Sequence, residues 1–329
     1  MGQFDLRRAA PLLLVALVFC LLPLVISKSM LPEATRIVVL AGCAMSLNLL
    51  VGATGLISMG QGLFFGLGAY VVALGTIRFG MGYGAAAALA LAICLPLSII
   101  VALISLRAKH LFFGLLTMAI GQVAFVFVSR NYKLTGGDDG LVGVVLPKWL
   151  DNDLAQHYFA IIVLVLAGLV LLRLLASPFG ATLGAVRDNP DRVASLGGNP
   201  KLYEIAAMVG GGLLGTVFGI VWSGTEGSVE PGLLSWVTSA MLLMMVALGG
   251  RSMFLGPLIG AVILEVTRAI LQSKSTNADL VVGIVVITCA VFFPEGVGPR
   301  LQQLFAGLKL RRTPAQTPAA KTTEMGGRA

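Results

Sequence analysis

The 329-residue sequence is poor in charged residues, which make up 12% of it, and it holds few histidines and cysteines. Ordinary soluble domains carry about 25% charged residues, so this composition excludes a chain of that kind. Hydrophobic residues instead make up 57% of the sequence, and 41 residues are glycine. Such a composition is typical of an integral membrane protein.

Motifs for nucleotide hydrolysis and for catalysis are also missing. A phosphate-binding P-loop needs a glycine followed directly by lysine and then serine or threonine, and no lysine follows a glycine here. Neither His110 nor His157 has a nucleophile or a carboxylate cluster near it in sequence, so we expect both to be interfacial anchors. The cysteines lack the spacing of metal ligands. The sequence therefore predicts no catalytic residues, no metal site and no bound cofactor.

Long apolar runs predict an all-α polytopic membrane protein with about ten spanning helices, because a helix needs about 20 apolar residues to cross the hydrocarbon core. The third, eighth and tenth predicted segments are short or interrupted by glycine, so a re-entrant segment could replace any of them. The segments cover residues 11–26, 37–55, 61–77, 82–106, 111–129, 158–175, 205–223, 233–248, 254–271 and 280–293.

The distribution of lysine and arginine predicts that both termini lie on the cytoplasmic side, since positive residues collect in cytoplasmic loops. One membrane domain then covers residues 1–308, with an inner loop at 177–204 and an outer loop at 130–156. Residues 309–329 are basic and rich in Pro, Thr and Ala, which predicts a disordered cytoplasmic tail. Arg7 and Arg8 precede an apolar run as in a secretory signal, but no small-x-small cleavage site follows, so we expect this segment to remain as the first span.

The inner loop 177–204 carries the signals of a short helix between two apolar runs. Asn189 is suited to the N-cap, Pro190 to the first helical position, and Gly197 and Gly198 to the end of the helix. Two interpretations stay open from these residues alone. The helix is either a solvated connector that rests on the membrane surface or a docking element for a partner.

Five segments follow one another in an order and spacing that resemble the LivM-type permeases of branched-chain amino acid ABC transporters. These segments are MSLNLLVGATGLISMGQGLFFGLGAYVVAL (45–74), LTGGDDGLVGV (134–144), SPFGATLGAVRDNPDRVASLGGNPKLYEIAAMV (177–209), LLMMVALGGRSMFLGPLIGAVIL (242–264) and VFFPEGVG (291–298). The resemblance implies a permease subunit of the bacterial inner membrane that moves branched-chain amino acids by alternating access. It implies as partners a second homologous permease, two ATP-binding cassette ATPase subunits, which use the ATP, and an extracytoplasmic solute-binding protein.

The resemblance also implies where the partners and the substrate meet the chain. The ATPase-coupling residues would belong to the inner loop and are Arg187, Asp188, Asn189, Asp191, Arg192, Ser195, Leu196 and Gly197. The binding protein would dock on the outer loop, where opposite charges suit a transient polar contact, at Arg130, Lys133, Asp138 and Asp139. Small and weakly polar groups would line a path without a high-affinity site, namely Ser46, Asn48, Ser58, Gln61, Thr117 and Gln122.

Glu265 is the one acidic residue deep in a predicted span, with Arg268 one turn further on. Its role is either pairing with that arginine or lining the path. A lone carboxylate gives little support to an ion-coupled carrier, which usually needs buried ionisable groups for its coupling ion. A permease for urea or short-chain amides resembles the same motifs and stays open as the main alternative.

Overall fold

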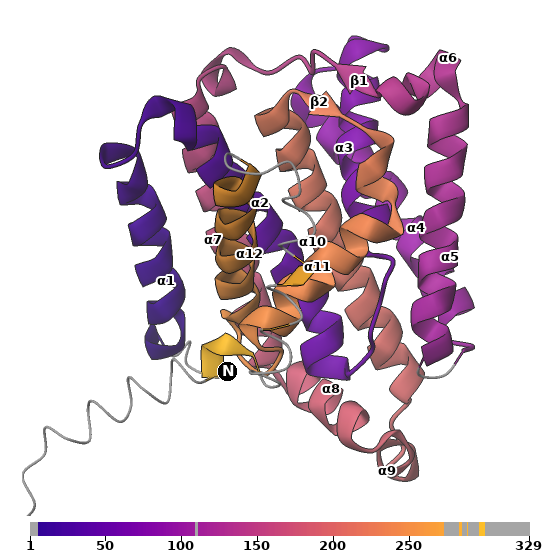
Figure 1. Cartoon of the computed structure of the whole chain (residues 1–329). Helices are drawn as coiled ribbons and strands as arrows, with labels where there is room; N and C mark the ends of the chain where they lie inside the picture. Colours follow the sequence, from indigo (N-terminus) through magenta and orange to yellow (C-terminus); the bar gives the residue numbers. More distant parts are fainter. Residues whose placement is uncertain (1–5, 109–110, 273–282, 285–287, 289–295, 300–329) are drawn as a thin grey trace, which may run out of the picture.

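The computed structural model describes residues 6–108, 111–272, 283–284, 288 and 296–299. Within these residues the chain is a bundle of helices with one two-stranded ribbon, β1 (Leu141–Val142) paired antiparallel with β2 (Ser228–Val229). Figure 1 shows most helices running between two ends of the bundle. We call the end with the ribbon the outer end and the opposite end the inner end, after the predicted orientation.

Among the residues that the structure describes, five helices are long and apolar enough to cross a membrane. They are α2 (Leu31–Asn48, with its flanking turns), α4 (Tyr83–Ser105), α5 (Leu111–Arg130), α7 (Asp153–Leu175) and α10 (Pro200–Glu226). Shorter helices stand among them: α1 (Leu6–Leu21), α3 (Gln61–Ile77), α11 (Trp236–Gly249) and α12 (Gly256–Gln272). The all-α polytopic fold is thus confirmed.

Every predicted segment between residues 11 and 271 overlaps one of these helices, although the bounds differ by several residues for α1, α2, α7 and α10. The predicted segment 280–293 lies almost wholly outside the described residues, as does the tail 309–329. The total of about ten spans and the side on which the termini lie therefore stay predictions.

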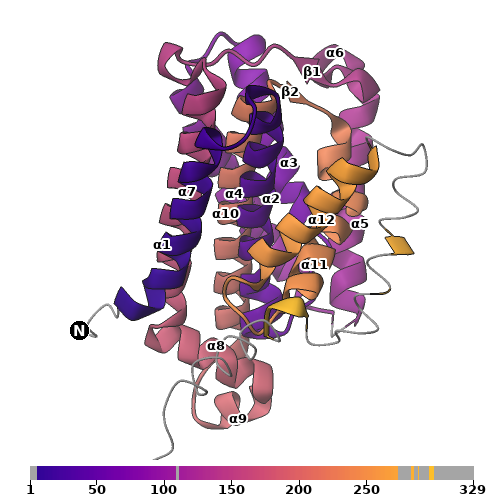
Figure 2. The same ribbon diagram turned by 60° about the vertical axis from the view of Figure 1, so that its left-hand side comes forward.

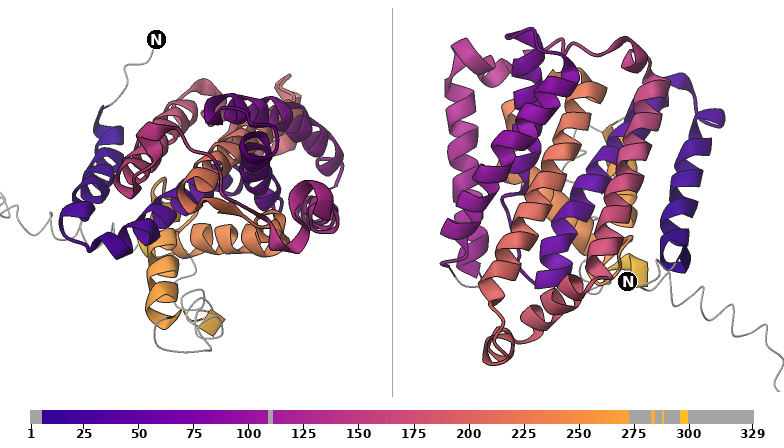
Figure 3. Two further views of the ribbon diagram at one scale, coloured as in Figure 1. Left: turned by 90° about the horizontal axis from the view of Figure 1, so that it is seen from above. Right: turned by 180° about the vertical axis from the view of Figure 1, so that it is seen from behind.

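Helices α2 and α10 form the centre of the bundle, and α4, α5 and α7 lie at its edge (Figure 3). Burial shows the same division, because 78% of the most apolar stretch of the α2 span is buried, against 28% in α4 and 22% in α5. The outer faces of α4 and α5 are apolar and exposed, as expected for helices that meet lipid.

A fully buried His157 ties α7 to the neighbouring helices, with Nδ1 2.9 Å from Thr35 Oγ1 and Nε2 3.1 Å from the Phe19 carbonyl. The expectation that His157 is an interfacial anchor was therefore wrong.

Two of the short helices begin after irregular backbone inside the bundle. After α2, a π-helical turn (Leu49–Thr54) ends at Gly55, where φ is +74°, and an extended stretch leads to the start of α3. A 3-10 helix (Pro231–Leu234) precedes α11. Helices α3 and α11 have 17 and 14 residues, fewer than the roughly 20 that span a bilayer. These are the third and eighth predicted segments, and both are as short as the sequence indicates; whether either is re-entrant stays a prediction.

The remaining elements lie at the two ends of the bundle (Figures 1 and 2). At the outer end are the 3-10 helices Leu22–Leu24, Lys28–Met30, Gly137–Asp139 and Lys148–Leu150 and the short α6 (Tyr132–Thr135). The inner end carries α8 (Pro178–Asp188) and α9 (Pro190–Ser195). The start of α1 lies at this inner end as well.

Candidate functional site

The two helices α8 and α9 form a hairpin that projects from the inner end of the bundle (Figure 2). Asn189 joins them, and its side-chain oxygen accepts a hydrogen bond of 3.0 Å from the backbone N–H of Arg192. Pro190 occupies the first position of α9, and Gly197, with φ +86°, follows its end. The predicted short helix is therefore present, with the predicted cap.

The hairpin presents a mixed surface to solvent. Leu196 is 83% exposed, although its neighbour Val193 is buried against the hairpin itself. A large apolar side chain that is this exposed, among charged groups, is suited to a partner's groove. All of the predicted coupling residues are exposed: Arg187, Asp188, Asn189, Asp191, Arg192, Ser195, Leu196 and Gly197.

One of the predicted coupling residues, Arg187, connects the hairpin to the interruption between α2 and α3. Nη1 of Arg187 donates a hydrogen bond of 2.8 Å to the carbonyl of Gly52, within the π-helical turn. Its side chain also passes so close to Gly55 that a Cβ there would lie 2.9 Å from Arg187 Cγ. An inner cavity of about 1010 Å³ lies beside this contact, between the turn, the start of α5, and α8.

The predicted path residues hold the interruption in place. Gln61 Nε2 donates to Ser46 Oγ at 2.7 Å and to the Gly211 carbonyl at 3.0 Å, which joins α3 to α2 and α10. The backbone N–H of Met59 donates to Thr117 Oγ1 at 3.1 Å, and that of Gly60 to Ser58 Oγ at 3.3 Å. Asn48 is half-buried just before the π-helical turn. Whether these groups face a substrate stays a prediction.

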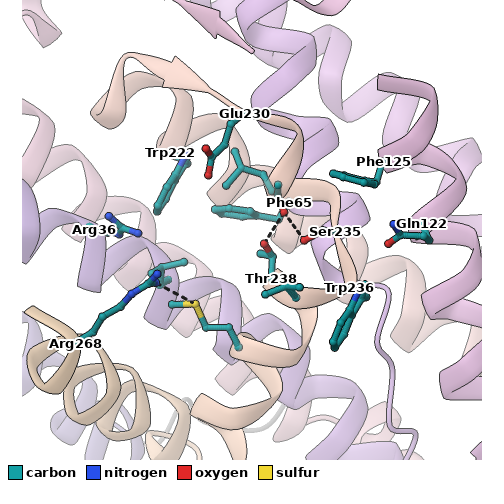
Figure 4. Close-up of a pocket in the computed structure, with 15 residues that line it drawn as sticks. Arg36, Phe65, Gln122, Phe125, Trp222, Glu230, Ser235, Trp236, Thr238 and Arg268 are labelled. Carbon is teal, nitrogen blue, oxygen red and sulfur yellow. Dashed lines mark hydrogen bonds between the residues drawn. The ribbon is translucent and has the colours of Figure 1, made fainter. Parts of the chain in front are cut away.

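A second cavity, of about 470 Å³, lies in the outer half of the bundle and is bounded by six helices and the stretch before α11. Gln122 is the predicted path residue that lines it, and Figure 4 shows Gln122 on the side opposite Arg36. The charged and aromatic residues that also line it, together with the apolar Val237, are Arg36, Phe65, Phe125, Trp222, Glu230, Trp236 and Arg268.

Glu265 lies beside this cavity in an ion pair. Its Oε2 is 3.8 Å from Nε of Arg36 on α2, and its side chain is 5% exposed. The guanidinium carbon of Arg36 also lies 5.3 Å from the centroid of the Trp222 ring, a distance at which the ring face attracts a cation. The sequence left two roles open for Glu265, pairing with Arg268 on its own helix or lining the path, and in the structure its ion pair is with Arg36 on another helix. Whether Glu265 lines the path stays a prediction.

The predicted docking residues are all exposed at the outer end. They lie on a compact turn that begins at the end of α5, where Thr135 Oγ1 donates to the Val128 carbonyl at 2.6 Å. Gly136, Gly137 and Gly140 all have positive φ and bring the turn back toward β1. The predicted docking residues on this turn are Arg130, Lys133, Asp138 and Asp139.

Among the described residues, no group of three or more His, Cys, Asp or Glu side chains could hold a metal.

A family model described as "Branched-chain amino acid transport system / permease component" matches residues 29–290 of this chain. The chain belongs to this family. It is 23% identical over 304 residues to the high-affinity branched-chain amino acid transport system permease protein LivM of Escherichia coli and to that of Salmonella typhimurium, an overlap of 84% of this chain and 72% of each relative. A probable branched-chain amino acid transport permease protein LivM of Methanocaldococcus jannaschii is 26% identical over 184 residues, 55% of this chain and 53% of the relative. No solved structure matches the chain.

Membership confirms the resemblance drawn from the sequence motifs. The chain is a permease component of a branched-chain amino acid transport system, and therefore a multi-pass membrane subunit with a transport role. In this chain the α8–α9 hairpin lies at the inner end of the bundle, the inner cavity borders the interruption between α2 and α3, and residues of α2, α3, α5, α10, α11 and α12 line the second cavity.

Proposed function

We propose that this permease moves branched-chain amino acids across the bacterial inner membrane by alternating access, powered by separate ATPase subunits that dock on the α8–α9 hairpin. A second permease subunit, two ATPase subunits and an extracytoplasmic binding protein complete the transporter. The observation that carries the proposal is the hairpin, because it exposes Leu196 among charged groups and is bonded to the interrupted helix through Arg187.

A compact, capped helix is a suitable element for transmitting force. An ATPase that shifts the hairpin would also shift the π-helical turn, since the bond between Arg187 and Gly52 joins them. A short extended stretch connects that turn to α3; Met59, just before α3, lines the inner cavity, and Phe65, within α3, lines the outer cavity. Short hinges of this kind absorb changes in backbone angles during domain movements, and interrupted helices are common where transporters hold their substrates.

The aromatic lining of the outer cavity supports an amino acid with an apolar side chain as the substrate. Phe65, Phe125, Trp222 and Trp236 all contribute to it, and such surfaces hold apolar groups rather than a small polar molecule. Urea and short-chain amides, the alternative substrates, would leave this surface in contact with water. Uptake of labelled leucine and labelled urea by the complete transporter separates the two.

The docking proposal is tested by two substitutions on the hairpin in the complete transporter. Arg192→Glu reverses a charge on the exposed face, and Leu196→Asp places a carboxylate in a contact that excludes water, at a cost on the order of a few kcal/mol. We expect both variants to insert and to pair with the second permease, but to lose their ATPase subunits during purification and to lose leucine uptake.

Arg78→Glu is the matched control, because Arg78 is exposed at the outer end of α3 and its reversal changes the net charge equally. This variant is expected to keep its ATPase subunits. If Arg192→Glu and Leu196→Asp also keep them and transport at the parental rate, the hairpin is a solvated connector and the proposal is wrong.

A further inference from the structure

The outer cavity has one charged wall and one largely apolar wall. Figure 4 shows Arg36 and Arg268 on one side, with Glu230 on the stretch that leads to α11, and Phe125 and Trp236 across from the arginines. Its volume of about 470 Å³ lies within the range of roughly 300–1,000 Å³ that is usual for small-molecule sites. The cavity therefore has the size and the division of polarity expected of a site for a small amphipathic molecule.

The charges around the cavity are arranged in two groups. Arg36 and Arg268 converge from α2 and α12, and the buried Glu265 lies 3.8 Å from Arg36. The two guanidinium groups line the cavity, whereas the carboxylates of Glu265 and Glu226, which both interact electrostatically with Arg36, are not among the lining residues. Glu230 supplies a negative charge at the adjacent edge, on an exposed residue. An electrically neutral ligand with a separated anion and cation would match both groups.

We infer that this cavity binds the zwitterionic backbone of an α-amino acid, with its carboxylate toward Arg36 and Arg268 and its ammonium toward Glu230. The side chain of the ligand lies toward Phe125 and Trp236. The inference rests on the proposed function, since it assigns the substrate of that function to named residues. Arginine is suited to this role because its planar guanidinium donates two parallel hydrogen bonds to a carboxylate.

Binding at this site is weak. Arg36 already interacts with Glu265 and with the face of Trp222, so a ligand carboxylate gains only part of a new ion pair. The cavity also lies at the end of the bundle that would receive substrate from a binding protein, where tight binding would slow the onward passage of the substrate. A dissociation constant in the millimolar range satisfies both conditions, in agreement with the expectation that the path has no high-affinity site.

Protection of an introduced cysteine measures such weak binding directly. Val237 lines the cavity and is 57% exposed, so Val237→Cys in the complete transporter should react with a small methanethiosulfonate. We expect millimolar leucine to slow this reaction several-fold. Leucinamide, which lacks the carboxylate, and 4-methylpentanoate, which lacks the ammonium, should not slow it at the same concentration.

Two sets of controls separate binding from indirect effects. Val145→Cys gives a similarly exposed thiol, at 60%, at a position that is not among the residues lining this cavity, and leucine should leave its reaction unchanged. In the Val237→Cys background, Arg268→Gln and Glu230→Gln should each abolish protection by leucine, whereas Arg268→Lys should keep part of it because it keeps the charge. Should Arg268→Gln fail to assemble, Glu230→Gln gives the same readout from an exposed position.

Each remaining outcome would count against the inference. Equal protection by leucine and leucinamide would show that the carboxylate is not recognised and would overturn it. If leucine does not slow the reaction of Val237→Cys in a transporter that carries this substitution alone and takes up leucine, this site is wrong but the proposed function stands. Protection by urea, together with an absence of leucine uptake, would overturn both.

Discussion

Arg187 and Gly52 lie 135 positions apart in the sequence, yet Arg187 Nη1 donates a hydrogen bond of 2.8 Å to the Gly52 carbonyl. The acceptor lies in the π-helical turn that ends the α2 span. Carbonyl groups at the end of a helix carry partial negative charge and attract a cation. The contact therefore joins the exposed hairpin to the interrupted helix by a charge-assisted bond.

Arg187→Ala is expected to separate ATP hydrolysis from transport. The side chain of Arg187 is about half exposed, at 48%, so its bond contributes roughly 1.5 kcal/mol or less to stability, and the variant should fold. Its ATPase subunits should stay bound, because Leu196 and Arg192 are unchanged. Leucine uptake per ATP hydrolysed should fall, and Arg187→Lys should restore part of it. The ratio is measured with the transporter reconstituted in liposomes.

Lys201→Ala is the control for the Arg187 variants, since Lys201 is an exposed cation at the nearby start of α10. It should leave the ratio of uptake to hydrolysis unchanged. A parental ratio in Arg187→Ala would show that the bond to Gly52 does not transmit movement.

Local features of the fold could be predicted from the sequence. Helix α3 begins and ends at the predicted residues, Gln61 and Ile77, because Gly60 directly precedes it and the basic Arg78 directly follows it. The cap of α9 could also be predicted, since Asn189 and Pro190 act on neighbouring backbone groups. Signals of this kind depend on residues only a few positions apart.

The outer cavity could not be predicted in this way. Arg36, Trp222 and Glu230 come from distant parts of the chain, and nothing in the residues around any of them indicates the others. Ser46 and Gln61 illustrate the same limit, since a weakly polar side chain in an apolar helix can face a path or bind a neighbouring helix. Their hydrogen bond of 2.7 Å shows the second role, and only the packing of α2 against α3 reveals it.

Labelling of two exposed positions tests the predicted orientation. Lys148 lies at the outer end and Ala194 on the inner hairpin, and both are exposed. With positive residues collected on the cytoplasmic side, an impermeant thiol reagent should label Lys148→Cys in intact cells. It should label Ala194→Cys only after the membrane is made permeable. Labelling of Ala194→Cys in intact cells would show that the predicted orientation is wrong. The hairpin would then lie outside the cell and could not dock the ATPases.

The crossing of α3 and α10 depends on glycine at positions where the two backbones touch. A Cβ on Gly219 would collide with the carbonyl of Phe65, and a Cβ on Gly68 with that of Thr216. Small residues allow this close approach between membrane helices. Since each obstacle is a backbone atom, the helices themselves must separate to admit a methyl group.

We therefore expect Gly219→Ala to destabilise the permease by about 1–3 kcal/mol, the usual cost of overpacking a close contact. Gly84→Ala in α4 is the matched control, because no atom lies within 4 Å of its added Cβ, and alanine favours a helix over glycine by up to about 1 kcal/mol. Thermal unfolding of the purified transporter should show a lower midpoint for Gly219→Ala alone. Phe65→Ala should not restore it, since the colliding atom belongs to the backbone. Restoration by Phe65→Ala would mean that side-chain volume, and not the approach of the two backbones, limits this crossing.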